Sequence, residues 1–363
     1  MANANVLDIC RVVNVINELS IRSREIFRGV VETFFQTGEP VGSRTLSETL
    51  RLNLSPATIR NVMADLEEYG LLYAPHKSAG RLPTDRGVRL FVDGLLQIGE
   101  LTNDEREKIE SRCAGNGRSL SAVLNETTEF LSGLTKTAGI VIAPKSDAAI
   151  NHVEFVLLSA GRALAIMVTK TGLVENRLID LPVGFTPSSL LEAANYLNAQ
   201  LAGRTLREAY TAIAQELETH STQLDALAAR VVEAGLATWS SDGEEQMLIL
   251  RGRANLLDEV DSSVDLEQLR QLLDTLERKK SFLRVIEKTE DGEGVHVFIG
   301  AENRLFNLAG CSMIVAPLAG GVSKAGAGLP LGAIGVIGPT RLNYARIIPM
   351  VDYTARAVSR LMG

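Results

Sequence analysis

The sequence has little cysteine and little histidine, and this scarcity limits the kinds of site that it can form. The three cysteines, Cys10, Cys113 and Cys311, lie far apart in the chain, and the four histidines do not cluster with them. Neither a CxxC pair nor another metal-ligand spacing is present, so a zinc site and a disulfide framework are not expected. We therefore expect reduced, buried thiols, no metal and no cofactor.

Long uninterrupted apolar runs are also missing from the sequence. The first twenty residues carry Asp8, Arg11 and Asn14 among their apolar positions, which does not fit the apolar core of a secretion signal. No later segment reaches membrane-spanning length without a charge or a turn. With 45% hydrophobic and 22% charged residues, the composition is that of a globular protein. We expect it in the cytoplasm, with no membrane partner.

Short catalytic motifs are absent as well. The glycine-rich run at 320–332 lacks the Gly-Lys-Ser/Thr of a P-loop, and a dinucleotide-binding turn would need glycine at Leu331 instead of at Gly332. The sequence has neither a GxSxG elbow nor an HExxH helix. Residues distant in sequence can still converge in a fold, but these absences favour a binding protein over an enzyme.

What the sequence does contain is enough length for two or three domains and an uneven distribution of charge. Its 363 residues carry a net charge of −7, which by itself argues against nucleic-acid binding. Residues 22–97, however, hold ten basic and nine acidic side chains, a net charge of +1 that leaves −8 for the rest. Within 77–89, four cations accompany Asp85 alone. The asymmetry places any DNA contact in the amino-terminal quarter.

Three helices are predicted in this quarter. Residues 23–37 place apolar side chains at helical spacing until Gly38, and a short helix follows over 44–50. The third helix begins at Ser55 and Pro56, because serine caps free amide groups and proline fits the first helical position. Three helices with a tight turn before the third predict a helix-turn-helix, whose third helix enters the major groove by its amino-terminal end.

Arg60 and Asn61 lie off the apolar stripe of this third helix, which includes Ile59 and Met63. Arginine can donate two hydrogen bonds to guanine, and asparagine can pair in the same way with adenine. The two residues are therefore the candidates for reading bases. Taken alone, one charged and one polar residue beside a helix stripe are more often simply solvated, so the prediction depends on the segments around them.

The following segment predicts a β-hairpin, or wing. Residues 71–73 read as a strand, 76–80 as a turn and 81–83 as the returning strand, before a helix capped by Thr84. Lys77 and Arg81 are expected at the tip of this hairpin, where cations can touch phosphate or the minor groove without specifying sequence. A solvated loop is the alternative.

The remainder of the chain alternates between β-rich and helical character. Buried or β-rich runs are expected at 139–143, 153–158, 163–169 and 174–181, and the economical arrangement of these is an antiparallel meander. From 188 to 236 the pattern is helical, and β-type runs resume at 296–299, 311–316 and 332–337. A helical block therefore interrupts a mixed α/β domain.

Seven segments of the sequence carry a resemblance to a known family. In the amino-terminal quarter they are Ser43–Ser47 (SRTLS), Ser55–Asn61 (SPATIRN), Met63–Glu67 (MADLE) and His76–Arg89 (HKSAGRLPTDRGVR). Further on they are Gly252–Leu257 (GRANLL), Ile299–Asn303 (IGAEN) and Gly335–Arg341 (GVIGPTR). With these segments the chain closely resembles the heat-inducible HrcA repressors over nearly its whole length.

The resemblance implies an α+β multidomain fold, with an amino-terminal winged helix-turn-helix and a GAF-like α/β domain that carries an inserted helical dimerisation domain. The expected bounds are 1–97 for the winged helix, 98–187 and 263–363 for the two parts of the GAF-like domain, and 188–262 for the insertion.

The resemblance also implies a function. We expect a dimeric repressor of heat-shock chaperone operons that binds an inverted-repeat operator in double-stranded DNA. Heat would relieve repression because a GroEL-type chaperonin is needed to supply active repressor. The candidate DNA-binding residues are Arg44, Thr45, Ser55, Thr58, Arg60, Asn61, His76, Lys77 and Arg81.

Two other functions remain open at this stage. GAF-like folds often hold small molecules, so the chain can instead be a ligand-responsive regulator of other genes, although fold alone does not decide this. A scaffold protein whose winged helix binds another protein is the third possibility. Salt-dependent binding to duplex DNA would separate the first two functions from the third.

Overall fold

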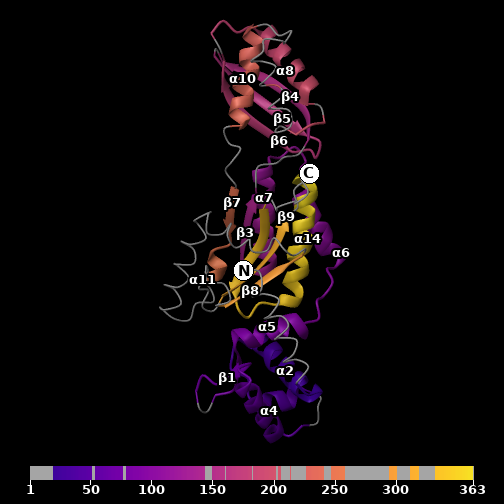
Figure 1. Cartoon of the computed structure of the whole chain (residues 1–363), viewed down its shortest axis with the longest axis vertical. Coiled ribbons are helices and arrows are strands. Elements are labelled where there is room, and N and C mark those ends of the chain that lie inside the picture. The colour runs from indigo at the N-terminus through magenta and orange to yellow at the C-terminus, as the bar shows by residue number, and fades with distance from the viewer. Residues whose placement is uncertain are drawn as a thin grey trace, which may run out of the picture.

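The computed structural model describes residues 19–50, 54–76, 79–143, 149–159, 161–181, 183–201, 203–205, 213, 226–240, 247–257, 294–300, 311–318 and 332–362. These residues form a mixed helix and sheet fold of three units, stacked along the long axis of the molecule (Figure 1). We call them the N-terminal unit, the central unit and the meander unit.

The N-terminal unit (residues 19–94) consists of three helices, a short hairpin and a fourth helix. The elements are α2 (Ile21–Thr37), α3 (Ser43–Thr49), α4 (Pro56–Glu68), β1 (Leu72–Tyr73), β2 (Leu82–Pro83) and α5 (Asp85–Gly94). Their apolar faces share one core, with Ile26, Leu46 and Ile59 fully buried in it. Gly38 ends α2 in the left-handed conformation, at φ 74°, which glycine adopts without steric cost.

The central unit is built on a five-stranded antiparallel sheet with the strand order β7-β3-β10-β9-β8. The strands are β3 (Ala138–Ala143), β7 (Met247–Arg251), β8 (His296–Ile299), β9 (Cys311–Leu318) and β10 (Gly332–Pro339). Its helices are α6 (Asn103–Cys113), α7 (Leu120–Thr135), α11 (Ala254–Leu257) and α14 (Tyr344–Met362). One face of the sheet shares a core with α6, α7 and α14, and the other face packs against Leu256 of α11.

The meander unit has its own three-stranded sheet and its own core. Strands β4 (Ile150–Ser159), β5 (Arg162–Thr169) and β6 (Val174–Asp180) pair antiparallel in chain order. Helices α8 (Pro187–Leu201) and α10 (Ala226–Ser240) pack on one face of this sheet. Figure 1 shows this unit at the end of the molecule opposite α4.

The structure divides the chain differently from the expected bounds. Strands β4 to β6, which fall within the expected 98–187 part, share no sheet with β3 and instead form a core with α8 and α10. Strand β7, which falls within the expected 188–262 insertion, pairs with β3 in the central sheet. Periodicity in the sequence identifies which residues of a strand face a core, but it does not say which core.

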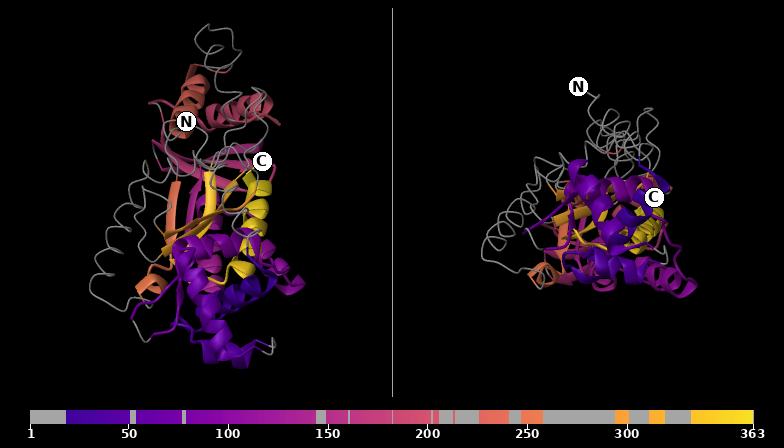
Figure 2. Two further views of the ribbon diagram at one scale, coloured as in Figure 1. Left: turned by 60° about the horizontal axis from the view of Figure 1, so that its bottom comes forward. Right: turned by 90° about the horizontal axis from the view of Figure 1, so that it is seen from below.

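The N-terminal unit docks onto the central unit through α5 and α2. The guanidinium of Arg89 in α5 donates to the carbonyl of Val297 in β8, and Val88 of α5 belongs to the core of the central unit. The Gly99 amide, just after α5, donates to the carbonyl of Ala345 at 3.0 Å. The view from below in Figure 2 shows the helices of the N-terminal unit lying across this end of the sheet.

Candidate nucleic-acid interface

Helix α4 presents two of the predicted site residues to solvent. Ile59 and Leu66 are fully buried against α2 and α3, whereas Arg60 and Asn61 in the first turns of α4 are exposed. Since the apolar stripe fixes the roll of the helix, it also fixes the direction of these two side chains. Figure 1 shows α4 at the end of the molecule farthest from the meander unit.

Ser55 and Thr58 have a local structural role at the start of α4. The Ser55 hydroxyl accepts a hydrogen bond from the Thr58 amide at 3.2 Å, and the two hydroxyl oxygens lie 2.9 Å apart. This is the predicted N-cap, followed by Pro56 at the first helical position. The amino-terminal end of α4 carries a partial positive charge, which favours an anion such as phosphate near Ser55.

Helix α3 contributes two further exposed candidates. Arg44 and Thr45 lie in its first turn, and both are exposed, while Leu46 is fully buried against α4. Helices α3 and α4 pack directly on one another. The candidates on α3 therefore lie next to the helix that carries Arg60.

Arg81, which was expected at the tip of the hairpin, lies directly before β2, on the turn side of the Tyr73–Leu82 pair, and is bridged to Val41. Its backbone exchanges two hydrogen bonds of 2.9 Å with Val41, between α2 and α3. Its guanidinium forms an ion pair of 2.8 Å with Glu67 near the end of α4. The positive charge of Arg81 is thus already paired within the protein. Glu67 is fourteen positions away and follows no shared periodicity, so the sequence carries no signal of this pair.

The turn of the hairpin is described only in part. His76 is exposed, and Lys77 lies outside the described residues. Gly80 packs against the backbone of Val41 so closely that a Cβ atom there would lie 2.4 Å from the Val41 carbonyl carbon. Only glycine fits at this position, where the returning arm of the hairpin packs on the segment between α2 and α3.

The basic stretch at 77–89 contributes fewer available cations than its sequence suggests. Besides Arg81, Arg89 is engaged within the protein, with Asp93 at 3.1 Å and with the Val297 carbonyl. Arg86 is exposed on α5. Two of the four cations in this stretch, Arg81 and Arg89, therefore form interactions within the protein. A count of charges in the sequence does not show this.

The described residues offer little for catalysis or metal binding. Burial raises the pKa of the Cys113 thiol to about 11, so this group stays protonated at neutral pH. Cys311 is half-buried, and Cys10 lies outside the described residues. In the part of the chain that the structure describes, no three His, Cys, Asp or Glu side chains are grouped as metal ligands. Among the helices of these residues, none has the length and apolarity needed to span a membrane.

Comparison of the sequence with known proteins shows the family of the chain. A family model described as the HrcA protein C terminal domain matches residues 121–348. The chain is 51% identical over 349 residues to the heat-inducible transcription repressor HrcA of Rhodopseudomonas palustris (strain TIE-1), covering 95% of each chain. It is also 51% identical over 351 residues to the protein of the same name from Chelativorans sp. (strain BNC1), covering 96% of this chain and 97% of the relative.

A solved structure supports the fold. A crystal structure of a hypothetical protein at 2.2 Å resolution matches with a TM-score of 0.67 and 24% sequence identity, over 95% of this chain and 98% of the other. At this level of sequence identity, the match supports the arrangement of helices and strands but gives no information about function.

Proposed function

Because this chain belongs to the HrcA family, whose matched relatives are named as transcription repressors and not as enzymes, we propose that it represses heat-shock genes by binding operator DNA. The observation that carries the proposal is the exposed pair Arg60 and Asn61 on a capped helix at the free end of the N-terminal unit. In this proposal α2 to α5 with the β1–β2 hairpin act as a winged helix-turn-helix.

The contacts divide into base reading and backbone positioning. Arg60 donates to guanine and Asn61 pairs with adenine in the major groove, because both are exposed in the first turns of α4. Ser55 and Thr58 bring the amino-terminal end of α4 to a phosphate. Arg44 and Thr45 on α3, with His76 and Lys77 on the hairpin, hold the flanking backbone. Arg81 acts indirectly, since its pair with Glu67 orients the hairpin.

The domain organisation follows the sheets. We place the winged helix at about 1–97, the GAF-like domain in the central unit, and the inserted dimerisation domain in the meander unit, at about 149–240 in place of 188–262. The insertion enters after β3 and leaves before β7, two strands that are hydrogen-bonded neighbours. A segment inserted between two paired strands leaves the central sheet intact.

The dimer interface is proposed on the uncovered face of the meander sheet. Val156 and Leu178 are 39% and 56% exposed, and Leu164 lies between them in register on the same face. The helices α8 and α10 cover the opposite face. An exposed apolar row of this kind is typical of a protein–protein interface, and we take a second copy of the chain as its partner. A two-fold dimer presents two recognition helices in opposite senses and so demands an inverted repeat.

The heat response is proposed to act through folding. Strand β3 must pair with β10 across the whole meander unit, for example at Val141 with Ile334, so the sheet has a high contact order and forms slowly. Slow folding exposes apolar strands to aggregation, and a GroEL-type chaperonin would raise the yield of active repressor. When heat occupies the chaperonin with other clients, active repressor falls and transcription rises.

The test of operator binding is a footprint of the purified protein on chaperone promoters, with a matched promoter lacking any inverted repeat. Protection of the inverted repeat, weakened as salt rises, is the expected result. Equal protection of both promoters, or none, would contradict the proposal.

The dimer interface is tested by sedimentation of Leu178→Lys. This variant should dissociate at concentrations where the parent is a dimer, whereas Leu191→Lys, at an exposed leucine on α8, should not. The reverse outcome would indicate that the dimer interface is formed by the helices instead.

Chaperonin dependence is tested by refolding the protein with and without chaperonin and titrating each sample with operator DNA. Equal fractions of active repressor in the two samples would contradict the proposal.

A further inference from the structure

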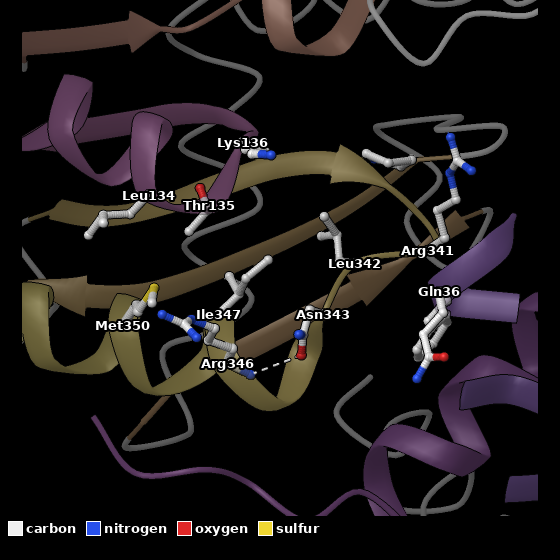
Figure 3. Close-up of a pocket in the computed structure, with 12 residues that line it drawn as sticks. Gln36, Leu134, Thr135, Lys136, Arg341, Leu342, Asn343, Arg346, Ile347 and Met350 are labelled. Atoms are coloured by element: carbon white, nitrogen blue, oxygen red, sulfur yellow. Dashed lines mark hydrogen bonds between the residues drawn. The ribbon is translucent and has the colours of Figure 1, made fainter. Parts of the chain in front are cut away.

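A cavity of about 350 Å³ lies where the N-terminal unit meets the central unit. Its walls come from the end of α2, the carboxyl end of α7, and the turn between β10 and α14. Figure 3 shows Lys136 on one side of it, Gln36 on another, and Leu342 and Ile347 between them. None of these residues is among the DNA-contact candidates.

The charged side chains around this cavity are all cations. Lys136, Arg341 and Arg346 line it, and none of the described lining residues is a carboxylate. Arg346 also pairs with Glu105 of α6, outside the cavity. Lys136 is exposed and forms no ion pair with any residue that the structure describes. Lys136 therefore brings to the cavity a positive charge that no described residue pairs with.

The backbone at Lys136 points to a function for this side chain. Lys136 ends α7 in the left-handed conformation, at φ 52° and ψ 41°. Glycine is the usual residue at such a helix end, because a Cβ atom makes the conformation unfavourable. Among the described residues, the other non-glycine residue with a positive φ is Asn116, of a type that tolerates it well. A lysine kept at a strained position, beside a cavity, suggests that its charge is used there.

The uncharged part of the lining has an apolar side and a polar side, the polar one formed by Gln36, Thr135 and Asn343. Phe35 from α2, Leu134 from α7 and Leu342, Ile347 and Met350 around the start of α14 line the same cavity. Small-molecule sites combine an apolar wall with polar groups that fix the orientation of the ligand, and both are present here. A ligand that suits both parts has one anionic head and a short apolar body.

We propose that this cavity binds a small organic anion, a carboxylate or phosphate monoester with an apolar body, whose head is held by Lys136. Its walls belong to both units, so an occupant contacts the docked arrangement of the N-terminal unit on the central unit. The proposal does not depend on operator binding, and its test does not use DNA.

The experiment measures thermal unfolding of the full chain with hexanoate and with phenyl phosphate as separate probes. Hexanamide supplies the same body without charge, inorganic phosphate supplies a head without the body, and chloride matches the ionic strength. At least one amphiphilic probe should raise the midpoint by about 2 °C or more, saturating at or below about 10 mM. Hexanamide, phosphate and chloride should not. The two probes also tell a carboxylate from a phosphate head.

The variant Lys136→Gly removes the charge and leaves a residue suited to the backbone there, so its folding is not in doubt. Its midpoint without probe should be unchanged or raised, and the affinity for the probe should fall by about tenfold or more. Asn116→Gly, at the other positive φ, and Arg106→Gln, at an exposed cation of α6, should both respond to the probe like the parent. The proposal is overturned if neither probe gives a saturable rise in the parent, or if Lys136→Gly keeps the full response.

Discussion

The ring of Phe35, near the end of α2, lies 5.4 Å from the ring of Tyr344, the first residue of α14, measured between centroids. Phe35 also meets the edge of Phe91 in α5 at 5.7 Å. Tyr344 is fully buried, and its hydroxyl oxygen lies 2.8 Å from Ser312 Oγ and 2.9 Å from the Thr340 carbonyl oxygen. Three aromatic rings thus join the N-terminal unit to the last helix of the central unit.

The first prediction concerns the energy of this contact. In a double-mutant cycle on the free energy of unfolding, Phe35→Leu and Tyr344→Leu should show a coupling of about 0.5–1.5 kcal/mol, the range for aromatic pairs. Tyr344→Phe keeps the ring, so its own cost should be about 1–2 kcal/mol from the lost hydroxyl contacts, with little change in the Phe35 coupling. If the changes in the free energy of unfolding of the two leucine variants are strictly additive, the two rings are neighbours that do not stabilise one another.

The second prediction separates base reading from general attraction to DNA. Arg60→Ala should weaken operator binding by about 1–3 kcal/mol and change binding to random duplex little. Arg106→Ala removes the same charge from an exposed position in the central unit and should affect neither. Fluorescence anisotropy measures the affinity of the parent, Arg60→Ala and Arg106→Ala for the operator duplex and for the random duplex. Equal losses on operator and random DNA for Arg60→Ala would rule out base reading.

The third prediction follows from the Arg81–Glu67 pair. Lys77→Ala should weaken operator and random DNA alike and reduce the dependence on salt by about one counterion. Arg81→Ala should leave the salt dependence nearly unchanged, because its charge is already paired with Glu67. Binding titrations over a series of salt concentrations give the two slopes. A slope for Arg81→Ala that falls as far as that for Lys77→Ala would show that Arg81 leaves Glu67 and contacts phosphate.

The sequence allowed local features to be predicted well. The helix over 23–37, the Ser55 cap with Pro56 after it, and the hairpin strands before Thr84 all appear where they were expected. Each of these follows from short-range rules: apolar spacing, a side chain capping an amide three residues on, and proline at a helix start.

Relations between distant segments were not predictable in the same way. The pairing of Arg81 with Glu67 and of β7 with β3 depends on the tertiary fold, and the same local pattern is compatible with other partners. The cavity at Lys136 gave no sequence signal either, because its walls come from segments as far apart as Phe35 and Met350. The left-handed backbone at Lys136 is also invisible in the sequence, since lysine rarely takes this conformation.

The fourth prediction compares two helical glycines. A Cβ atom at Gly87 in α5 would lie 2.2 Å from the Leu71 carbonyl oxygen, whereas a Cβ atom at Gly133 in α7 would have no heavy atom within 4 Å. Gly87→Ala should therefore destabilise the protein by about 1–3 kcal/mol, as overpacking does. Gly133→Ala should stabilise it by about 0.5–1 kcal/mol, because alanine is the better helix former. Urea unfolding measures both, and a neutral Gly87→Ala would mean that α5 can move away from Leu71.

The fifth prediction concerns pH and the start of α6. The Thr102 amide donates to the Glu105 carboxylate at 2.9 Å and lowers the pKa of this carboxyl, burial opposes the shift, and the Thr102 hydroxyl and Arg346 lower the pKa further. A carboxyl with a lowered folded-state pKa stabilises the fold above its unfolded pKa of about 4.3. This stabilisation is lost as the pH falls through the lower, folded-state value.

Glu105→Gln should accordingly cost about 1 kcal/mol at pH 7, where it loses the charge but can still cap the helix. The difference from the parent should begin to shrink as the pH falls below the unfolded pKa of about 4.3 and should vanish once the pH is below the lower, folded-state pKa. Glu107→Gln, at an exposed position of the same helix, should have little effect at either pH. A Glu105→Gln penalty that stays constant down to pH 3 would show that shape, not charge, explains it. Urea unfolding across the pH series provides the measurement.

The position of β10 in the central sheet has a consequence during protein synthesis. Strand β10 lies between β3 and β9 and pairs with both, yet it is the last strand of the sheet to leave the ribosome. Until Gly332–Pro339 has left the ribosome, the sheet consists of two separate strand pairs, β3 with β7 and β9 with β8. Each pair has an unpaired edge, to which a strand of another chain can bind. A chain whose synthesis ends before Gly332 therefore has two separate strand pairs with exposed edges, and it is not a shortened but functional protein.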